Sequence, residues 1–281
     1  MGAADGSVFT RNRVHVGEHE ILYLRGGRGQ PLVYLHGMGG GGKWESYHMA
    51  LANDTLTYAP QLPGLQDYAI PAGIQSVADY VTLVLAYLDT IEVEKLVLAG
   101  HSIGAWIALR IAMEHPDRVE RLILADSLGL ETPDAPAVHL GRLDEEEFGK
   151  LLLARLGAIA TANPYGFGAE FTNARTSPEF DRQWKGRGLI AELVQGRYTD
   201  PDLIAGLGRI SAETLIVWGD RDGLAPPAHA RLLHTSIPNS RLTFIEDAGH
   251  LPMVERREAF HRVCRDFLVG VEEEVPGAVA G

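Results

Sequence analysis

A chain of 281 residues, 46% of them hydrophobic, is long enough for one large domain or for a core with an inserted piece. Its 25 basic and 37 acidic residues give a net charge of −12, which argues against nucleic acid and anionic membranes as partners. The single cysteine, Cys264, excludes an internal disulfide bond, and its helical surroundings predict a small core residue.

No apolar run approaches the roughly 20 residues that a membrane-spanning helix needs. Residues 1–6 lack the basic start and the apolar stretch of a signal peptide. We therefore expect a cytoplasmic protein without a membrane partner. The oligomeric state cannot be read from the sequence.

The first part of the chain contains short runs that predict strands and one helix. Residues 8–16 and 20–24 alternate between apolar and polar side chains and predict a hairpin. Two further strands are predicted over 32–35 and 55–59. Apolar side chains at helical spacing then predict a helix over 76–88, with Ser76 as its N-cap.

The stretch that follows predicts a strand, a tight turn and a buried helix. Residues 96–99 are apolar strand formers, and the helix runs from residue 105 to about residue 115. Between them, Gly-His-Ser-Ile-Gly at 100–104 matches G-x-S-x-G, the nucleophile elbow. Such a turn strains the backbone of its central residue, and side chains two positions away would collide, so glycine stands there. The alternative is an ordinary turn in which Ser102 is only a helix N-cap.

The second part of the chain continues the alternation of strands and helices. Strands are predicted over 119–125, 214–218 and 241–245, and helices over 228–233 and 253–267. The residues 270–281 are predicted to form a disordered tail.

This alternation predicts the fold class. Apolar strands that alternate with helices are typical of an α/β protein, in which a mostly parallel central sheet carries helices on both faces. Residues 127–210 interrupt the pattern, because they offer helical pieces such as 145–159 and several prolines but no strand of comparable quality. We expect a core of residues 1–126 and 211–281, with 127–210 inserted as a helical cap.

A serine nucleophile needs a base, and the base needs an orienting acid. His250 follows the last predicted strand, which places it at the same edge of the sheet as Ser102. Asp222 follows the preceding strand, so the chain order is serine, aspartate, histidine. Asp126 and Asp220, each at the end of a predicted strand, remain alternatives for the acid.

These motifs together resemble the alpha/beta-hydrolase family. The resemblance rests on His36-Gly37, the 100–104 motif, Trp218 to Asp222, and Gly249-His250, and so it covers nearly the whole core. It implies that Ser102 is the nucleophile, His250 the base and Asp222 the acid. It implies neither a metal nor an organic cofactor.

The oxyanion hole is expected to use two backbone N–H groups, those of Ile103 and Met38. A glycine run follows Met38 and gives the loop room to bend towards a ligand. The residues expected to contact substrate are His36, Gly37, Gly39, Trp44, His101 and Leu251.

Residues 37–43 also match G-x-x-x-x-G-K, the pattern of a phosphate-binding loop. The next residue is Trp44, where that loop needs a serine or threonine to bind magnesium. A nucleotide site would also leave the serine, histidine and aspartate unexplained. We therefore set the nucleotide-binding interpretation aside.

The leading functional hypothesis is a serine hydrolase that cleaves a carboxylic ester of a small to medium, largely apolar or aromatic substrate through an acyl-enzyme. The side chains of the insert that would favour such a substrate are Leu151, Leu152, Leu153, Tyr165, Phe167, Phe171 and Trp184.

Two alternatives remain open. A carbon–carbon bond hydrolase of meta-cleavage (ring-fission) products uses the same triad, and its substrate carboxylate could be held by Arg175, Arg182, Arg187 or Arg197. In that subfamily the residue after the histidine is typically tryptophan, whereas here it is Leu251. A ligand-binding receptor with a vestigial triad is the further alternative.

Overall fold

The computed structural model describes residues 9–65, 70–154, 193–194 and 198–271. The N-terminal residues 1–8, most of the predicted cap (155–192 and 195–197) and the predicted tail 272–281 lie outside that description. Every helix within the described part of the chain is too short or too polar to cross a membrane.

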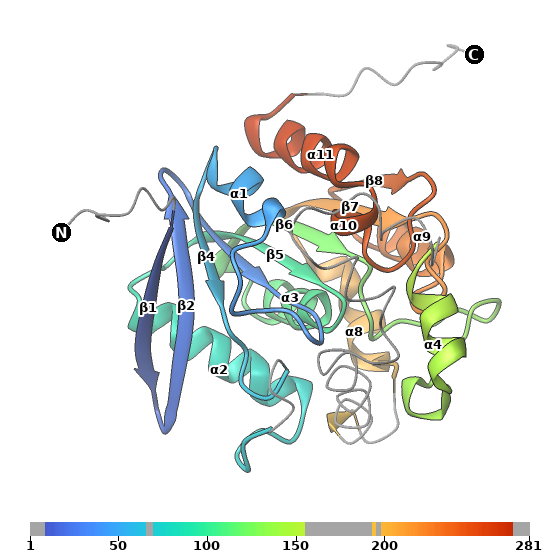
Figure 1. Ribbon diagram of the computed structural model, residues 1–281, viewed down its shortest axis with the longest axis horizontal. Coiled ribbons are helices and arrows are strands. Elements are labelled where there is room, and N and C mark those ends of the chain that lie inside the picture. Colours follow the sequence, from blue (N-terminus) through green and yellow to red (C-terminus); the bar gives the residue numbers. More distant parts are fainter. Residues whose placement is uncertain (1–8, 66–69, 155–192, 195–197, 272–281) are drawn as a thin grey trace.

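The described residues form an α/β fold around a sheet of eight strands (Figure 1). The first two strands form the predicted hairpin and join the sheet through an antiparallel pair, and all remaining neighbours are parallel. In spatial order the strands are β1 (Phe9–Val16), β2 (His19–Gly27), β4 (Leu56–Pro60), β3 (Pro31–Leu35), β5 (Leu96–His101), β6 (Val119–Ala125), β7 (Glu213–Gly219) and β8 (Ser240–Ile245). The predicted, mostly parallel sheet is confirmed.

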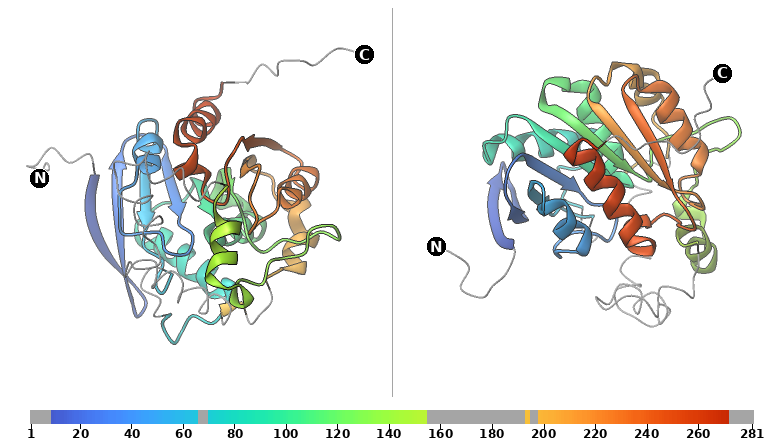
Figure 2. Two further views of the ribbon diagram at one scale, coloured as in Figure 1. Left: turned by 45° about the vertical axis from the view of Figure 1, so that its right-hand side comes forward. Right: turned by 90° about the horizontal axis from the view of Figure 1, so that it is seen from above.

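Helices cover both faces of the sheet (Figure 2). One apolar core contains residues of α2 (Val77–Thr90), α3 (Ile103–Glu114) and α9 (Pro227–Ser236). The other core contains residues of α1 (Ser46–Ala52) and α11 (Arg257–Val269). Each central strand alternates between them, because successive side chains of a strand point to opposite faces. In β5, for example, Leu96 and Leu98 enter the first core, whereas Val97 and Ala99 enter the second.

Several sequence predictions are confirmed at residue level. Ser76 is the N-cap of α2, and its hydroxyl accepts a hydrogen bond from the Asp79 N–H group. Cys264 is a core residue of α11, with 2% of its surface exposed. Two helices, α1 and α8 (Pro201–Gly206), were not predicted; Asp200 followed by Pro201, an N-cap before proline, is the signal that marks the start of α8.

The prediction of one closing helix over 253–267 is wrong, because the structure has two helices there. The chain forms α10 (Pro252–Glu255), leaves helical geometry at Arg256, and then forms α11. The Arg256 guanidinium donates to the Glu246 carbonyl and to the Asp247 carboxylate, both in the turn that follows β8. These bonds stabilise the non-helical conformation of Arg256 that separates the two helices.

The helix predicted over 145–159 is also shorter than expected. It forms α4 (Glu145–Leu152) and ends in an extended residue, Leu153. The carbonyls of Leu151 and Leu152 accept hydrogen bonds from the N–H groups of Gly223 and His250, at 3.1 and 2.8 Å. Because two loops of the core donate hydrogen bonds to these carbonyls, α4 ends where it meets the core. Residues 155–159 lie outside the described chain.

Candidate active site

Ser102 stands at a strained turn between β5 and α3. Its φ of +57° and ψ of −122° place a non-glycine residue in a region that L-amino acids rarely adopt. A Cβ atom at Gly100 would lie 2.5 Å from the Gly104 carbonyl oxygen, and one at Gly104 would lie 2.2 Å from the carbonyl oxygen of Leu35. Both glycines are therefore required for α3 to approach β3 and β5 this closely.

Three side chains from three strand ends form a hydrogen-bonded chain. His250 Nε2 lies 2.9 Å from Ser102 Oγ, and His250 Nδ1 lies 2.8 Å from Asp222 Oδ2. All three residues are buried. This is the geometry of a Ser-His-Asp triad, in which the acid fixes the tautomer of the histidine and the other ring nitrogen faces the hydroxyl.

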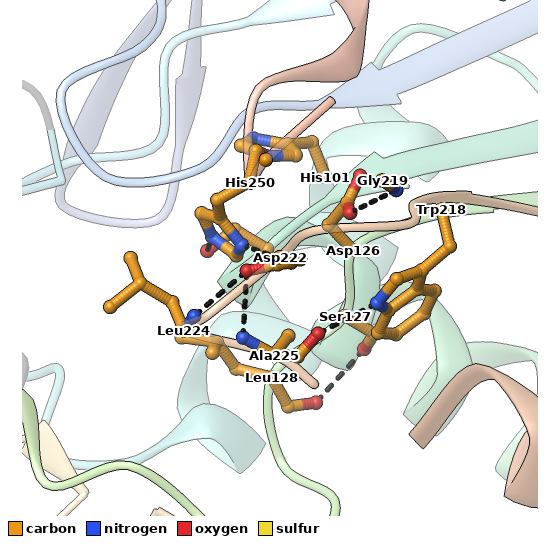
Figure 3. A network of polar contacts seen from close by, with 12 residues as sticks. His101, Asp126, Ser127, Leu128, Trp218, Gly219, Asp222, Leu224, Ala225 and His250 are labelled. Atoms are coloured by element: carbon orange, nitrogen blue, oxygen red, sulfur yellow. Dashed lines mark hydrogen bonds and ion pairs between the residues drawn. The ribbon is translucent and has the colours of Figure 1, made fainter. Parts of the chain in front are cut away.

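The acid that meets His250 is Asp222, as Figure 3 shows. Its other oxygen, Oδ1, accepts the N–H groups of Leu224 and Ala225, at 2.8 and 2.9 Å, so the carboxylate is fixed from two sides. The alternatives are engaged elsewhere. Asp126 Oδ1 accepts the Gly219 N–H group at 2.9 Å, and Asp220 Oδ1 accepts that of Ala248 at 3.3 Å.

Two neighbouring histidines are held in neutral form. His36 Nδ1 donates to the Gly37 carbonyl and Nε2 accepts the Leu62 N–H group, while burial lowers the pKa of His36 to about 4. His101 Nε2 donates to the backbone carbonyl of His250 at 2.7 Å, and burial together with the nearby His250 lowers the pKa of His101 to about 3. His101 therefore holds the backbone of His250 in place.

Of the two residues expected to form the oxyanion hole, one follows Ser102 in the chain and the other lines the same pocket. Ile103 is the first residue of α3, and the N–H group of a first helical residue has no acceptor within its own helix. Met38 lies on the loop after β3 and lines the same pocket as Ser102. Their role as an oxyanion hole is taken up below as a proposal.

A pocket opens over Ser102 and His250. Among the residues predicted to bind substrate, those that line it are His36, Gly37, Gly39, His101 and Leu251. Trp44 is not among its lining residues. The Trp44 ring is stacked between the rings of Phe9 and His48, with centroid distances of 5.2 and 5.3 Å.

Of the three insert leucines named from the sequence, Leu152 lines this pocket, whereas Leu151 and Leu153 are not among its lining residues. Sequence reasoning missed other apolar residues of the lining, namely Leu128, Leu140, Phe148 and Leu224. Phe148 and Leu152 are four residues apart on α4, and this helical spacing of apolar residues was the available signal. The four cap aromatics named from the sequence (Tyr165, Phe167, Phe171 and Trp184) and the four cap arginines lie outside the described residues.

Comparison with known proteins agrees with this geometry. Residues 32–263 match the model of the alpha/beta hydrolase family. The chain belongs to that family. This hydrolase is 31% identical over 233 residues to a pimeloyl-[acyl-carrier protein] methyl ester esterase of Neisseria meningitidis, covering 78% of the chain and 70% of the esterase.

Two further relatives extend the comparison. The hydrolase is 30% identical over 263 residues to a 2-hydroxymuconate semialdehyde hydrolase of a Pseudomonas species, covering 86% and 88% of the two chains. The crystal structure of a membrane phospholipase A, a bacterial virulence factor, superposes with a TM-score of 0.76 at 25% identity, covering 95% and 87%. An esterase and a semialdehyde hydrolase are thus distant relatives of this chain, and the phospholipase structure shares its fold.

Proposed function

We propose that this protein is a serine hydrolase that cleaves a carboxylic ester of a small to medium, largely apolar or aromatic substrate. The observation that carries the proposal is the chain of hydrogen bonds, 2.9 and 2.8 Å long, from Ser102 through His250 to Asp222, beneath a pocket. The similarity to an ester hydrolase at 31% identity supports the ester as the bond that is cleaved.

The mechanism follows from the geometry. His250 Nε2 removes the proton from Ser102 Oγ as this oxygen attacks the ester carbonyl. The backbone N–H groups of Ile103 and Met38 hold the oxyanion of the tetrahedral intermediate. The intermediate collapses, and the alcohol leaves with the proton from His250. Water, deprotonated by the same histidine, then cleaves the acyl-enzyme and restores the serine.

The pocket supports an apolar acyl or alcohol group. Leucines and Phe148 form much of the lining near Ser102 and His250, and apolar side chains favour binding of apolar substrate surface. The charged side chains Lys43, Glu45 and Arg257 also lie in this lining.

We also propose that residues 127–210 act as a cap over this site, on a core of residues 1–126 and 211–281. Leu140, Phe148 and Leu152 from this segment line the pocket, which supports a covering role. A variant in which Phe148 is replaced by alanine is expected to change KM and acyl-chain preference more than the turnover of the smallest ester.

The proposed partner is a small molecule, and no cofactor is assigned. The net charge of −12 supports neither nucleic acid nor an anionic membrane as a partner. The cytoplasm remains the expected compartment, which cell fractionation would test.

The second candidate is hydrolysis of a carbon–carbon bond in a ring-fission product. The similarity to the 2-hydroxymuconate semialdehyde hydrolase favours it. Leu251, where that subfamily typically has tryptophan, argues against it. A receptor with a vestigial triad is the third candidate, and a serine-directed phosphonate distinguishes it, because only a competent Ser102 is labelled.

The deciding experiment compares the wild-type protein with Ser102→Ala on p-nitrophenyl esters of increasing acyl length, and in parallel on a ring-fission dienoate. We expect ester turnover that falls by about 10⁴-fold in Ser102→Ala, with exposed Ser211→Ala as the matched control. Fast dienoate cleavage with trace ester turnover would favour the second candidate. Ester turnover that survives Ser102→Ala would overturn the nucleophile.

A further inference from the structure

Asp126 is a buried carboxyl group to which the proposed mechanism gives no role. It follows β6, has no exposed surface, and accepts the Gly219 N–H group through Oδ1. Its other oxygen, Oδ2, is buried and has no hydrogen-bond partner among the described residues. A charged oxygen in that position would be very unfavourable, because nothing there replaces the water that ionised carboxylates bind.

A second carboxylate stands beside it. Carboxyl oxygens of Asp126 and Asp222 and a ring nitrogen of His250 lie within 4.8 Å of one another. Figure 3 shows Asp126 and Asp222 in the same network of polar contacts, and Asp222 acts on the Asp126 carboxyl group through its charge and as a side-chain hydrogen-bond partner. Two buried carboxylates this close cannot both be charged without strong repulsion, so the pair is expected to keep one proton.

The hydrogen bonds decide which carboxyl group carries that proton. Asp222 accepts from Leu224, Ala225 and His250, three donors that stabilise its charged form. Asp126 accepts from Gly219, and Tyr34 and the carboxyl group of Glu255 are the other titratable groups that act on it. Burial and the charge of Asp222 raise the pKa of Asp126 well above its usual range.

An ionised carboxylate has about four acceptor positions, and the described bonds of Asp222 use three of them. We propose that Asp126 is a neutral carboxylic acid in the working enzyme and that its Oδ2–H group donates a hydrogen bond to the Asp222 carboxylate. This bond gives the buried Oδ2 atom a partner. It also makes Asp126 a positioning residue that acts on His250 through Asp222.

The consequence for catalysis, which rests on the proposed function, concerns the charge beside His250. With Asp126 neutral, the pair carries one negative charge. An ionised Asp126 would add a second charge, stabilise the protonated imidazole and leave fewer enzyme molecules with a free base. A neutral Asp126 therefore positions Asp222 without adding a charge that would stabilise the protonated form of His250.

The direct test uses the wild-type protein labelled with ¹³C in the aspartate side-chain carboxyl groups. Carboxyl-carbon NMR at pH 7 should show one aspartate with the chemical shift of a protonated acid, and this signal should be absent from Asp126→Asn. Exposed Asp117→Asn is the control, which should leave the signal of the protonated acid in place. A wild-type spectrum in which every aspartate is ionised, or a protonated signal that persists in Asp126→Asn, would overturn the proposal.

The kinetic test uses two substitutions. Asparagine is neutral at every pH, and its amide can accept from Gly219 and donate to Asp222, so Asp126→Asn should keep the pH midpoint of the acid limb of kcat/KM. Asp126→Ala removes both contacts and should lower kcat by about tenfold with little change in KM. An acid limb that moves to lower pH in Asp126→Asn would show an ionised Asp126 and overturn the proposal. Turnover that survives Ser102→Ala would defeat the proposed function and leave the NMR result standing.

Discussion

The backbone N–H group of His250 donates a hydrogen bond to the carbonyl of Leu152, 2.8 Å away. The proposed base is thereby tied to the last turn of α4, which belongs to the predicted cap segment 127–210. The loop that carries Asp222 is tied to the same segment, because the N–H group of the adjacent Gly223 donates a hydrogen bond to the carbonyl of Leu151. Residues 151–154, which we name the strap, therefore contact the loops that carry both the base and the acid.

Gly249→Ala should disrupt the strap. A Cβ atom at Gly249 would lie 2.7 Å from the nitrogen of Ala154 and from the carbonyl oxygen of Leu152. Backbone atoms cannot move aside cheaply, so the strap or the His250 loop must shift. We expect a loss of about 1–3 kcal/mol in the free energy of unfolding and a reduced kcat, measured by denaturant unfolding and ester kinetics.

Gly208→Ala is the matched control for this substitution. A Cβ atom at Gly208 would lie 3.8 Å from the nearest heavy atom, the Ser236 carbonyl oxygen, which is an ordinary contact. If Gly249→Ala behaves like Gly208→Ala in both measurements, the strap does not position the histidine.

Glu255→Gln should weaken the contact between the strap and the loop that carries His250. The Glu255 carboxylate accepts the N–H groups of Gly249 and Ala154, at 2.9 and 3.0 Å. A glutamine amide can accept only one of these bonds with its oxygen, and its NH₂ group faces the other donor. We expect kcat to fall by about tenfold, equivalent to about 1.4 kcal/mol, while exposed Glu258→Gln leaves it unchanged.

This effect should depend on pH. Burial raises the pKa of Glu255 to about 6. Above pH 6 the ionised carboxylate accepts both N–H groups, and below pH 6 the protonated acid accepts them more weakly. The ratio of wild-type to Glu255→Gln turnover should therefore shrink towards one as the pH falls through 6. A ratio that stays constant from pH 5 to pH 8 would contradict the role of this carboxylate.

The sequence predicted where most strands lie along the chain, a mostly parallel sheet, and the three residues that meet at the site. It could do so because parallel strands end at one edge of the sheet, so motifs after β5, β7 and β8 must lie near one another. Strand positions alone left Asp126 open as the acid, since both aspartates follow neighbouring strands and lie close to His250. The family resemblance favoured Asp222, and the contact of Asp222 with His250 agrees with that choice.

Contacts between distant segments were beyond prediction. Nothing local in the sequence marks the carbonyls of Leu151 and Leu152 as acceptors for loops more than 70 residues away, and so the predicted helix was too long. Trp44 was expected to contact substrate, but its ring stacks on that of Phe9, which stands far earlier in the chain. The residues next to Trp44 in the sequence do not reveal such a distant contact.

Asp200→Ala should destabilise the fold without touching the site. Asp200 is buried, caps α8 by accepting the Leu203 N–H group, and accepts from Trp106 Nε1 and twice from the Arg110 guanidinium. Alanine leaves these donors without their acceptor at the junction of α3 and α8. We expect a loss of about 2–4 kcal/mol in the free energy of unfolding.

Exposed Asp202→Ala, in the first turn of the same helix, is the control and should change stability little. Both variants should keep the KM of the wild-type protein, because neither side chain lines the pocket. Equal stabilities of the two variants would show that the Asp200 contacts contribute nothing net.

Three buried histidines should make the fold sensitive to acid. Burial lowers the pKa of His36 to about 4 and that of His48 and His101 to about 3, against about 6.5 in an unfolded chain. Between these values the unfolded chain binds protons that the folded protein excludes, so stability falls as the pH falls below 6.5. Together the three histidines can change the free energy of unfolding by up to about 4 kcal/mol per pH unit. Asp126 and Glu255 act in the opposite direction, because their pKa values are raised in the folded protein.

The contribution of one histidine can be isolated with His48→Gln. His48 Nδ1 accepts the Glu45 N–H group at the start of α1, and the glutamine oxygen can replace that acceptor. The variant should lose stability less steeply than the wild-type protein between pH 6 and pH 4, by up to about 1.4 kcal/mol per pH unit in denaturant unfolding. Exposed His15→Gln should keep the wild-type slope. Parallel pH profiles for His48→Gln and the wild type would mean that His48 is protonated in the folded protein, because only a proton excluded on folding gives the slope.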